Sequence, residues 1–204
     1  TVDRFPTVDG INGGTIFGNR LTFHYDTRDN LVTPTDGAQI TAYAEINQNY
    51  RLSGSPLFQR YEIELKKLIP SPSKHLIMVI RANLQMTFGD RVPFFEQSSL
   101  GGQNNLRGYG IDRFIDKHLV ALSIEQRIHV FRTRISNVIG DFGVAPFVDT
   151  GKVFSSFSKR INRDYEVTPG IGFRGIVRPN VVGRVDYGYS SEGGAVFAGL
   201  DFPY

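Results

Sequence analysis

The sequence predicts an all-β protein, and it favours a transmembrane antiparallel β-barrel over a soluble β-sandwich. Apolar and polar residues alternate with a period of two along most of the 204-residue chain, as they do in β-strands. The alternation from Leu76 to Phe88 is about twice as long as the roughly 5 to 6 residues usual in soluble strands. A tilted strand needs about 9 to 11 residues to cross a bilayer, so this length favours a barrel wall.

The first half of the chain predicts four strands. The clearest runs from Leu76 to Phe88, where apolar residues occupy the even positions and Arg81 and Gln85 lie among the odd ones. The four predicted strands are Leu21–Asp26, Ile40–Asn47, Tyr61–Lys66 and Leu76–Phe88. Turn-forming residues separate them at Asp29–Gly37 and Pro70–Lys74.

The second half predicts five more strands, and a tenth could precede Gly13. Their polar faces carry both signs of charge, and aromatic residues lie near the strand ends, as in the interfacial girdle of a membrane barrel. On these faces Glu125 and Asp149 point to the polar, lumen-facing side. The five strands are Val120–Val130, Asp141–Asp149, Tyr165–Arg174, Arg184–Tyr189 and Val196–Tyr204.

Composition excludes several classes of function. The chain has no cysteine, so disulfides, thiol catalysis and cysteine zinc sites are ruled out. The net charge of +3 comes from 23 basic and 20 acidic residues that are spread evenly, and we expect no nucleic-acid partner. No apolar run reaches the length of a transmembrane helix, and no signal-peptide pattern follows Thr1. The four histidines lie far apart and no serine-nucleophile motif is present, so we expect no enzyme, no metal and no cofactor.

The longest interruption of the strand pattern runs from Gly89 to Lys117 and contains the stretch "LGGQNNLRGYGIDRF", Leu100 to Phe114. It lacks the residues of a phosphate-binding loop and the spacing of a dinucleotide-binding motif. The simplest alternative is a flexible, solvent-exposed loop. However, a loop of this length is usually functional or folded back. In a barrel lined with charge it can fold inward and place Arg107 among interior carboxylates.

Five segments of the chain resemble the outer-membrane assembly-factor superfamily. This is the bacterial surface antigen family, which includes the Bam- and Tam-type insertases and the two-partner secretion pores, and the resemblance is to its C-terminal barrel region only. The stretch "PFFEQSSLGGQNNLRGYGIDRF" is similar to the family's inward-folded sixth extracellular loop. The segments that carry the resemblance are Tyr25–Ile46, Pro93–Phe114, Ser123–Arg127, Phe147–Phe154 and Gly170–Arg174.

The resemblance implies a specific arrangement around the loop motif Leu106-Arg107-Gly108-Tyr109. Arg107 would pack inside the barrel against Asp149 and Glu125, and Tyr109 would be an aromatic buttress. The two glycines expected to leave room for the loop tip are Gly170 and Gly172. Whether this cluster only holds the barrel in shape or also takes part in substrate handling stays open.

The final residues, "FAGLDFPY", are similar to the family's C-terminal signal. The matching positions are Gly199, Phe202 and Tyr204. Pro203 is unusual in a paired strand because proline cannot donate to the ladder, and it suggests a sheet edge or a frayed closing seam.

The resemblance also has limits, since family members carry about sixteen strands and periplasmic POTRA domains. We therefore expect residues 1–204 to form a single barrel domain without a POTRA domain. Because lipid does not tolerate unpaired edges, the barrel would close with 10–12 strands, or a partner would complete it.

The function that follows is that of a minimal assembly-factor-type barrel in the outer membrane of a Gram-negative bacterium. It would act in outer-membrane biogenesis through insertion of barrel proteins, lipid handling or membrane perturbation. The expected partners are outer-membrane lipids and client barrel proteins. Three alternatives remain: a passive anchoring barrel or pore, the barrel part of a larger patatin-type autotransporter, and a homodimer formed through the exposed edges.

Overall fold

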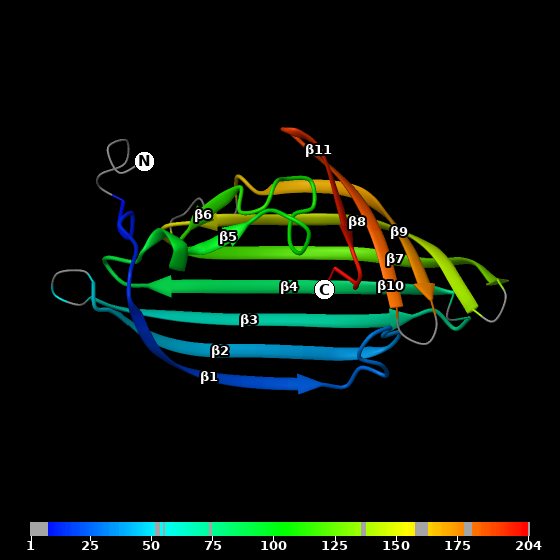
Figure 1. The fold of residues 1–204 in the computed structure, drawn as a ribbon, viewed down its shortest axis with the longest axis horizontal. Helices are drawn as coiled ribbons and strands as arrows, with labels where there is room; N and C mark the ends of the chain where they lie inside the picture. The colour runs from blue at the N-terminus through cyan, green and yellow to red at the C-terminus, as the bar shows by residue number, and fades with distance from the viewer. Residues whose placement is uncertain are drawn as a thin grey trace.

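The computed structural model describes residues 8–51, 54, 56–73, 75–135, 138–157, 163–177 and 181–203. Its main feature is one antiparallel sheet of nine strands, which follow one another in sequence order (Figure 1). The nine strands are β1 (Ile16–Asp26), β2 (Gly37–Asn49), β3 (Leu57–Pro70), β4 (Leu76–Phe88), β7 (His118–Ile135), β8 (Val138–Phe154), β9 (Glu166–Val177), β10 (Val181–Ser190) and β11 (Gly193–Gly199).

The nine strands predicted from alternation are all present, and β4 has the predicted bounds. Most of the others extend beyond their predicted ends, because backbone pairing continues past the residues with clear alternation. The tenth strand before Gly13 is not found, since residues 8–12 form turns and residues 1–7 lie outside the described part of the chain.

The last predicted strand ends earlier than expected. β11 stops at Gly199, and the prediction that it continues toward Tyr204 is wrong for residues 200–203. Arg184 on β10 binds Asp201, and Arg127 on β7 lies over the ring of Phe202, so these residues turn toward the polar face of the sheet. Two side-chain contacts therefore replace the strand pairing. Tyr204 lies outside the described residues.

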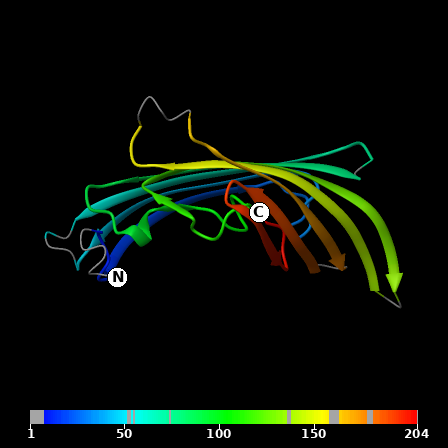
Figure 2. The same ribbon diagram turned by 90° about the horizontal axis from the view of Figure 1, so that it is seen from above.

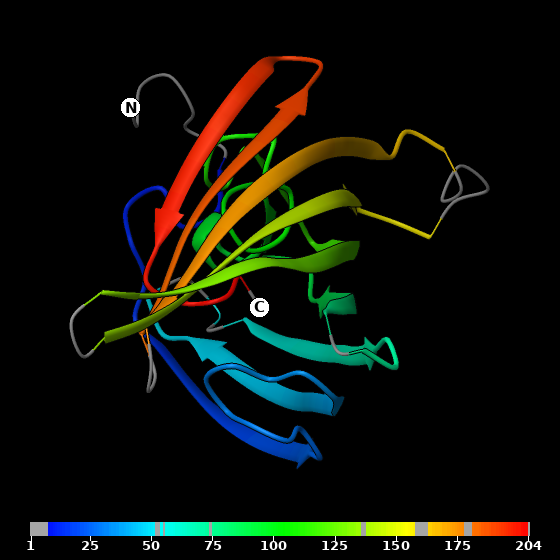
Figure 3. The same ribbon diagram turned by 90° about the vertical axis from the view of Figure 1, so that its right-hand side faces the viewer.

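The alternation sorts the side chains onto two faces of a strongly curved sheet (Figures 2 and 3). The convex face carries a belt of exposed apolar residues, as a wall in contact with lipid requires. Examples on this face are Leu76, Leu122, Ile124, Val148, Ile171, Phe173 and Val185. The concave face carries buried polar and charged residues, including Asn83, Ser123, Glu125, Asp149, Thr168 and Asp186. The sheet thus has the inside-out polarity of a membrane barrel wall.

The described sheet has two edges, β1 and β11, and within the residues described these strands do not pair with each other. The wall therefore contains nine of the eleven strands. The other two, β5 (Ser98–Leu100) and β6 (Phe114–Asp116), pair with each other. None of the helical segments in the described ranges is long and apolar enough to span a membrane.

The long connection from residue 89 to residue 117 folds into the concave face (Figure 3). It is more ordered than a loop, because it holds a short 3-10 helix, Phe94–Glu96, as well as β5 and β6. A small apolar cluster lies beneath it, made of Leu100, Leu106, Tyr109, Leu119 and Ala121. This cluster joins the loop to β7 and gives the polar lumen a local hydrophobic core.

Candidate functional site

A tight turn at the tip of the folded-in loop presents the Arg-Gly-Tyr motif to the wall. The backbone N–H of Tyr109 donates to the carbonyl oxygen of Leu106 at 3.1 Å, and that of Gly102 donates to the carbonyl oxygen of Tyr109 at 3.2 Å. Gly102 has a φ of +99°, a conformation that glycine adopts without strain. These bonds turn the backbone so that Arg107 points at β7 and β8.

Arg107 is completely buried, and its guanidinium is held from several sides. Its Nε and Nη2 donate to the two carboxylate oxygens of Asp149 at 2.8 and 2.9 Å, and its backbone N–H donates to the same carboxylate at 3.1 Å. Its Nη1 donates to Glu125 at 2.7 Å. The ring of Phe147 lies 3.3 Å from the guanidinium carbon. A bidentate pair with a cation–π contact suits arginine and not lysine.

Three further arginines extend this centre into a buried ionic network across β7 to β10. Glu125 also accepts from Arg127 at 3.0 Å and from Arg174 at 2.9 Å. Asp186 pairs with Arg174 and with Arg184, both at 2.8 Å. The carboxylates of Glu125, Asp149 and Asp186 are fully buried, so each needs a cation close by. The network thus binds four neighbouring strands and the loop to one another.

The glycines act differently from the expectation for Gly170 and Gly172. A side chain at Gly170 would collide with the ring of Phe147, and one at Gly172 would collide with Asp186 and Arg174. These two glycines therefore make room for wall residues and not directly for the loop tip.

The loop backbone instead approaches Gly188, where a Cβ atom would lie 2.5 Å from the carbonyl carbon of Arg107 and 2.8 Å from the nitrogen of Gly108. Gly108 in turn packs against Thr168, since a Cβ atom there would lie 2.5 Å from its methyl group. Both close contacts are possible only because glycine has no side chain.

Tyr109 anchors the C-terminal end of the loop motif. Its ring is 2% exposed and packs edge-on against Phe114, with 5.0 Å between ring centres. Its hydroxyl donates to Glu166 and lies 2.9 Å from the hydroxyl of Ser191. Burial, and then the hydrogen bond to Glu166, raise the pKa of Tyr109. A surface ion pair between Arg113 and Glu192, at 2.6 Å, ties the loop to the β10–β11 turn.

The structure therefore brings together Leu106, Arg107, Gly108, Tyr109, Glu125 and Asp149. The C-terminal positions lie at the border of the network: Gly199 ends β11, and the ring centre of Phe202 lies 3.8 Å from the guanidinium carbon of Arg127, which pairs with Glu125. Sequence reasoning missed Gly188 and the residues Arg174, Arg184 and Asp186. The last three occupy lumen-facing positions of β9 and β10, so their alternation with apolar residues was the available signal.

The buried charges of this cluster are paired with one another. Each buried carboxylate accepts from at least one arginine, so paired charges join the loop to the wall. Among the residues that the structure describes, no group of three or more histidine, aspartate and glutamate side chains could hold a metal ion.

Comparisons with known proteins agree with this geometry. Residues 14–188 match the Omp85 superfamily domain. The solved structure of BamA from Haemophilus ducreyi lacking POTRA domains 1–3 is similar in fold, with a TM-score of 0.62 at 16% sequence identity. The match covers 87% of this chain and 40% of that structure, so the chain spans less than half of its length. No curated protein matches significantly.

Proteins of this superfamily are barrels of the outer-membrane biogenesis type, and they locate to the bacterial outer membrane in general. The match spans most of the sequence and includes the inward-folded loop together with the strands that bind it. This chain belongs to the Omp85 superfamily.

Proposed function

We propose that this chain is a minimal outer-membrane assembly-factor barrel that assists the insertion of client barrel proteins. The observation that carries the proposal is the buried pairing of Arg107 with Glu125 and Asp149. It clamps the loop to β7 and β8 and makes this part of the wall rigid. The strands β1 and β11 form the two edges of the described sheet, and their outer backbone groups are not paired with another strand there. A rigid wall with edges that can pair is suited to template an incoming strand.

The unequal strand lengths support a local effect on the bilayer. β8 has 17 residues and β11 has 7. At a rise of about 3.4 Å per residue and a tilt near 45°, a strand of this shorter length covers roughly 17 Å, against a hydrocarbon core of about 30 Å. A wall that is low beside β11 favours thinning of the membrane there, which lowers the barrier to insertion.

The partners of the proposed function are outer-membrane lipids and client barrel proteins of a Gram-negative bacterium. Residues 1–204 would act as one barrel domain. Because backbone groups facing lipid must be paired, β1 and β11 also require strands from elsewhere. A second copy of the chain, or further strands of a longer chain, would supply them.

The test is a folding assay with phospholipid vesicles. A urea-unfolded client barrel is diluted into vesicles with and without the purified protein, and its folded fraction is followed on gels without heating. We expect several-fold faster folding with the wild-type protein. We expect less acceleration with Arg107→Gln and unchanged acceleration with Lys67→Gln, which changes an exposed residue of β3 away from the cluster and from both edge strands.

A wild-type protein that is itself folded in the vesicles but leaves the client's rate unchanged would contradict the proposal. That result would favour the passive anchoring barrel.

A further inference from the structure

The folded-in loop contacts strands on both sides of the lumen, and the ionic network described above accounts for only one side. Gln103 and Asn104 are adjacent in the chain. The side-chain oxygen of Gln103 accepts from Nη2 of Arg184 on β10 at 3.3 Å, whereas the backbone carbonyl oxygen of Asn104 accepts from Nη1 of Arg81 on β4 at 2.7 Å. Three strands, β7, β8 and β9, separate β4 from β10 in the sheet. Two neighbouring loop residues therefore connect strands that are not neighbours.

A second arginine on the same side as Arg81 holds the loop at another point. Arg60 on β3 donates to a carboxylate oxygen of Glu96 at 2.6 Å and also to the backbone carbonyl oxygen of Glu96. Arg81 is oriented by Glu64 on β3, which accepts from its Nε at 2.8 Å. The two arginine side chains are only 16% and 11% exposed. Both thus reach from the wall to carbonyl oxygens of the loop backbone.

On the opposite side, the ionic network and close packing fasten the loop to the wall. Arg107 pairs with Asp149 on β8, and its backbone lies against Gly188 on β10. Loss of the two arginines on β3 and β4 would therefore leave the loop attached to β8 and β10. It would free the loop from the other side of the lumen.

Pairing between neighbouring strands does not by itself fix the width of the lumen. Adjacent strands of a sheet are rotated relative to each other by about −10 to −35°, and these rotations add up across the sheet. Four strand pairings lie between β4 and β10. Small changes at each pairing would move β4 away from β10 unless a contact across the lumen opposes the movement.

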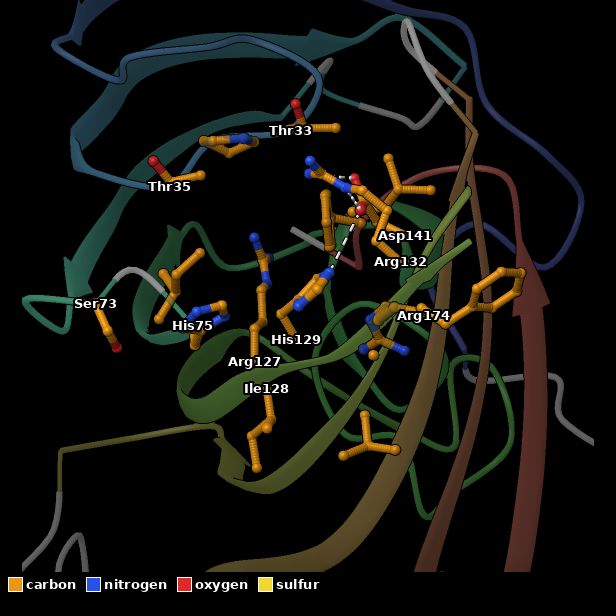
Figure 4. A pocket seen from close by; sticks show the side chains of 17 residues that line it. Thr33, Thr35, Ser73, His75, Arg127, Ile128, His129, Arg132, Asp141 and Arg174 are labelled. Atoms are coloured by element: carbon orange, nitrogen blue, oxygen red, sulfur yellow. Dashed lines mark hydrogen bonds and ion pairs between the residues drawn. The ribbon is translucent and has the colours of Figure 1, made fainter. Parts of the chain in front are cut away.

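At the other end of the lumen, the two sides of the wall are separated by a cavity of about 460 Å³ (Figure 4). His75 lines this cavity and precedes β4, whereas the loop follows β4, so the cavity lies at the end opposite the loop. Thr35 and Ser73, from the connections of β1 to β4, line it across from Arg132 and Asp141 on β7 and β8 (Figure 4). The two sides thus face each other across a cavity at this end, and the loop bridges them at the other.

We propose that the loop is a brace across the lumen, in which Arg60 and Arg81 position it against β3 and β4 and thereby hold these strands at a fixed distance from β10. The Arg107 network fastens one end of the brace, and the two arginines fasten the other. The brace sets the width of the lumen whether or not the protein acts on client barrels.

The experiment measures the distance between two spin labels by double electron–electron resonance, in the protein folded in phospholipid vesicles. Because the chain has no cysteine, Ile63→Cys on β3 and Val185→Cys on β10 can be labelled without a background signal. Both side chains are exposed on the convex face, away from the loop. We expect a single narrow distance distribution when the brace is intact.

Loss of Arg60 and Arg81 should broaden this distribution and move it to longer distance. Arg60→Gln and Arg81→Gln each leave the other arginine in place, so each alone should have a small effect. The double variant should shift the mean by more than the two single shifts added together, because the two attachments act in parallel. Lys66→Gln combined with Arg20→Gln is the matched control, since it removes two cations whose carboxylate partners lie within the wall.

A milder second variant combines Arg81→Gln with Glu96→Gln. It leaves the bond from Arg60 to the backbone carbonyl oxygen of Glu96 in place, and it should move the distance in the same direction by a smaller amount.

Two results would overturn the proposal. One is a distribution that matches the wild type in both double variants, in proteins that migrate as folded species on unheated gels. The other is equal broadening by the control pair, which would show that loss of charge from the wall, and not loss of loop contacts, changes the distance.

Discussion

Replacement of Asp149 by asparagine tests how strongly the loop is locked to the wall. Asp149 accepts three hydrogen bonds from Arg107, and both side chains are fully buried. Asparagine keeps the shape of the side chain but removes its charge. The guanidinium of Arg107 is then left with two carboxylates, that of Glu125 at 2.7 Å and that of Asp186 at 3.5 Å. Breaking one side of a buried pair costs about 3–5 kcal/mol, and the remaining Glu125 places the loss near the lower value.

The assay is equilibrium urea unfolding of the protein in vesicles, followed by the shift between folded and unfolded bands on unheated gels. Because natural domains have about 5–15 kcal/mol of stability in total, a loss of about 3 kcal/mol should move the midpoint clearly. Arg107→Gln should cost a similar amount. The double variant should cost at least about 2 kcal/mol less than the sum of the two, since neither partner is then left as an isolated buried charge.

Two outcomes would refute this reasoning. One is an Asp149→Asn midpoint that matches that of Arg20→Gln, whose exposed pair with Glu45 is the matched control. The other is strict additivity in the double variant, which would show that the two residues contribute independently of each other.

Further predictions concern the loop contacts. Gly188→Ala should displace the loop, because the new Cβ would lie 2.5 Å from the carbonyl carbon of Arg107. Limited proteolysis should then cut residues 89–117 faster than in the wild type. Gly183→Ala is the control and should not change the cutting rate, because the nearest atom to its Cβ is 3.8 Å away. Because the pKa of Tyr109 is raised in the folded protein, the stability that its hydroxyl gives the loop is fully present below the ordinary pKa of 10.0 and is lost as the pH rises through the higher folded-state value. Proteolysis of the loop should therefore accelerate at that pH in the wild type. The Tyr109→Phe variant should not show this step. Glu192→Gln should raise the rate of loop proteolysis slightly at low salt and not at high salt, because the pair of Glu192 with Arg113 is solvent-exposed and screened by salt. A raised rate that persists at high salt would contradict this.

Local patterns in the sequence determined the strands and their faces. Alternation is a property of neighbouring residues, and in a barrel wall every second residue meets lipid while the others meet the lumen. This is why β4 was predicted with both of its ends, and why Glu125 and Asp149 were placed on the lumen side. The loop motif could be assigned a target only through the resemblance to a family, because Arg107 and Asp149 are separated by 42 positions.

Only the tertiary structure decided which residues meet across the lumen. No local pattern in the sequence marks Gly188. A side chain is excluded there only because the backbone of Arg107 and Gly108, distant in sequence, occupies the space. The early end of β11 is also a tertiary feature: Arg184 and Arg127 on other strands contact Asp201 and Phe202, where strand pairing would otherwise continue. Strand alternation acts over two residues and can be read from the chain, whereas the ionic network and the cavity depend on curvature of the whole sheet.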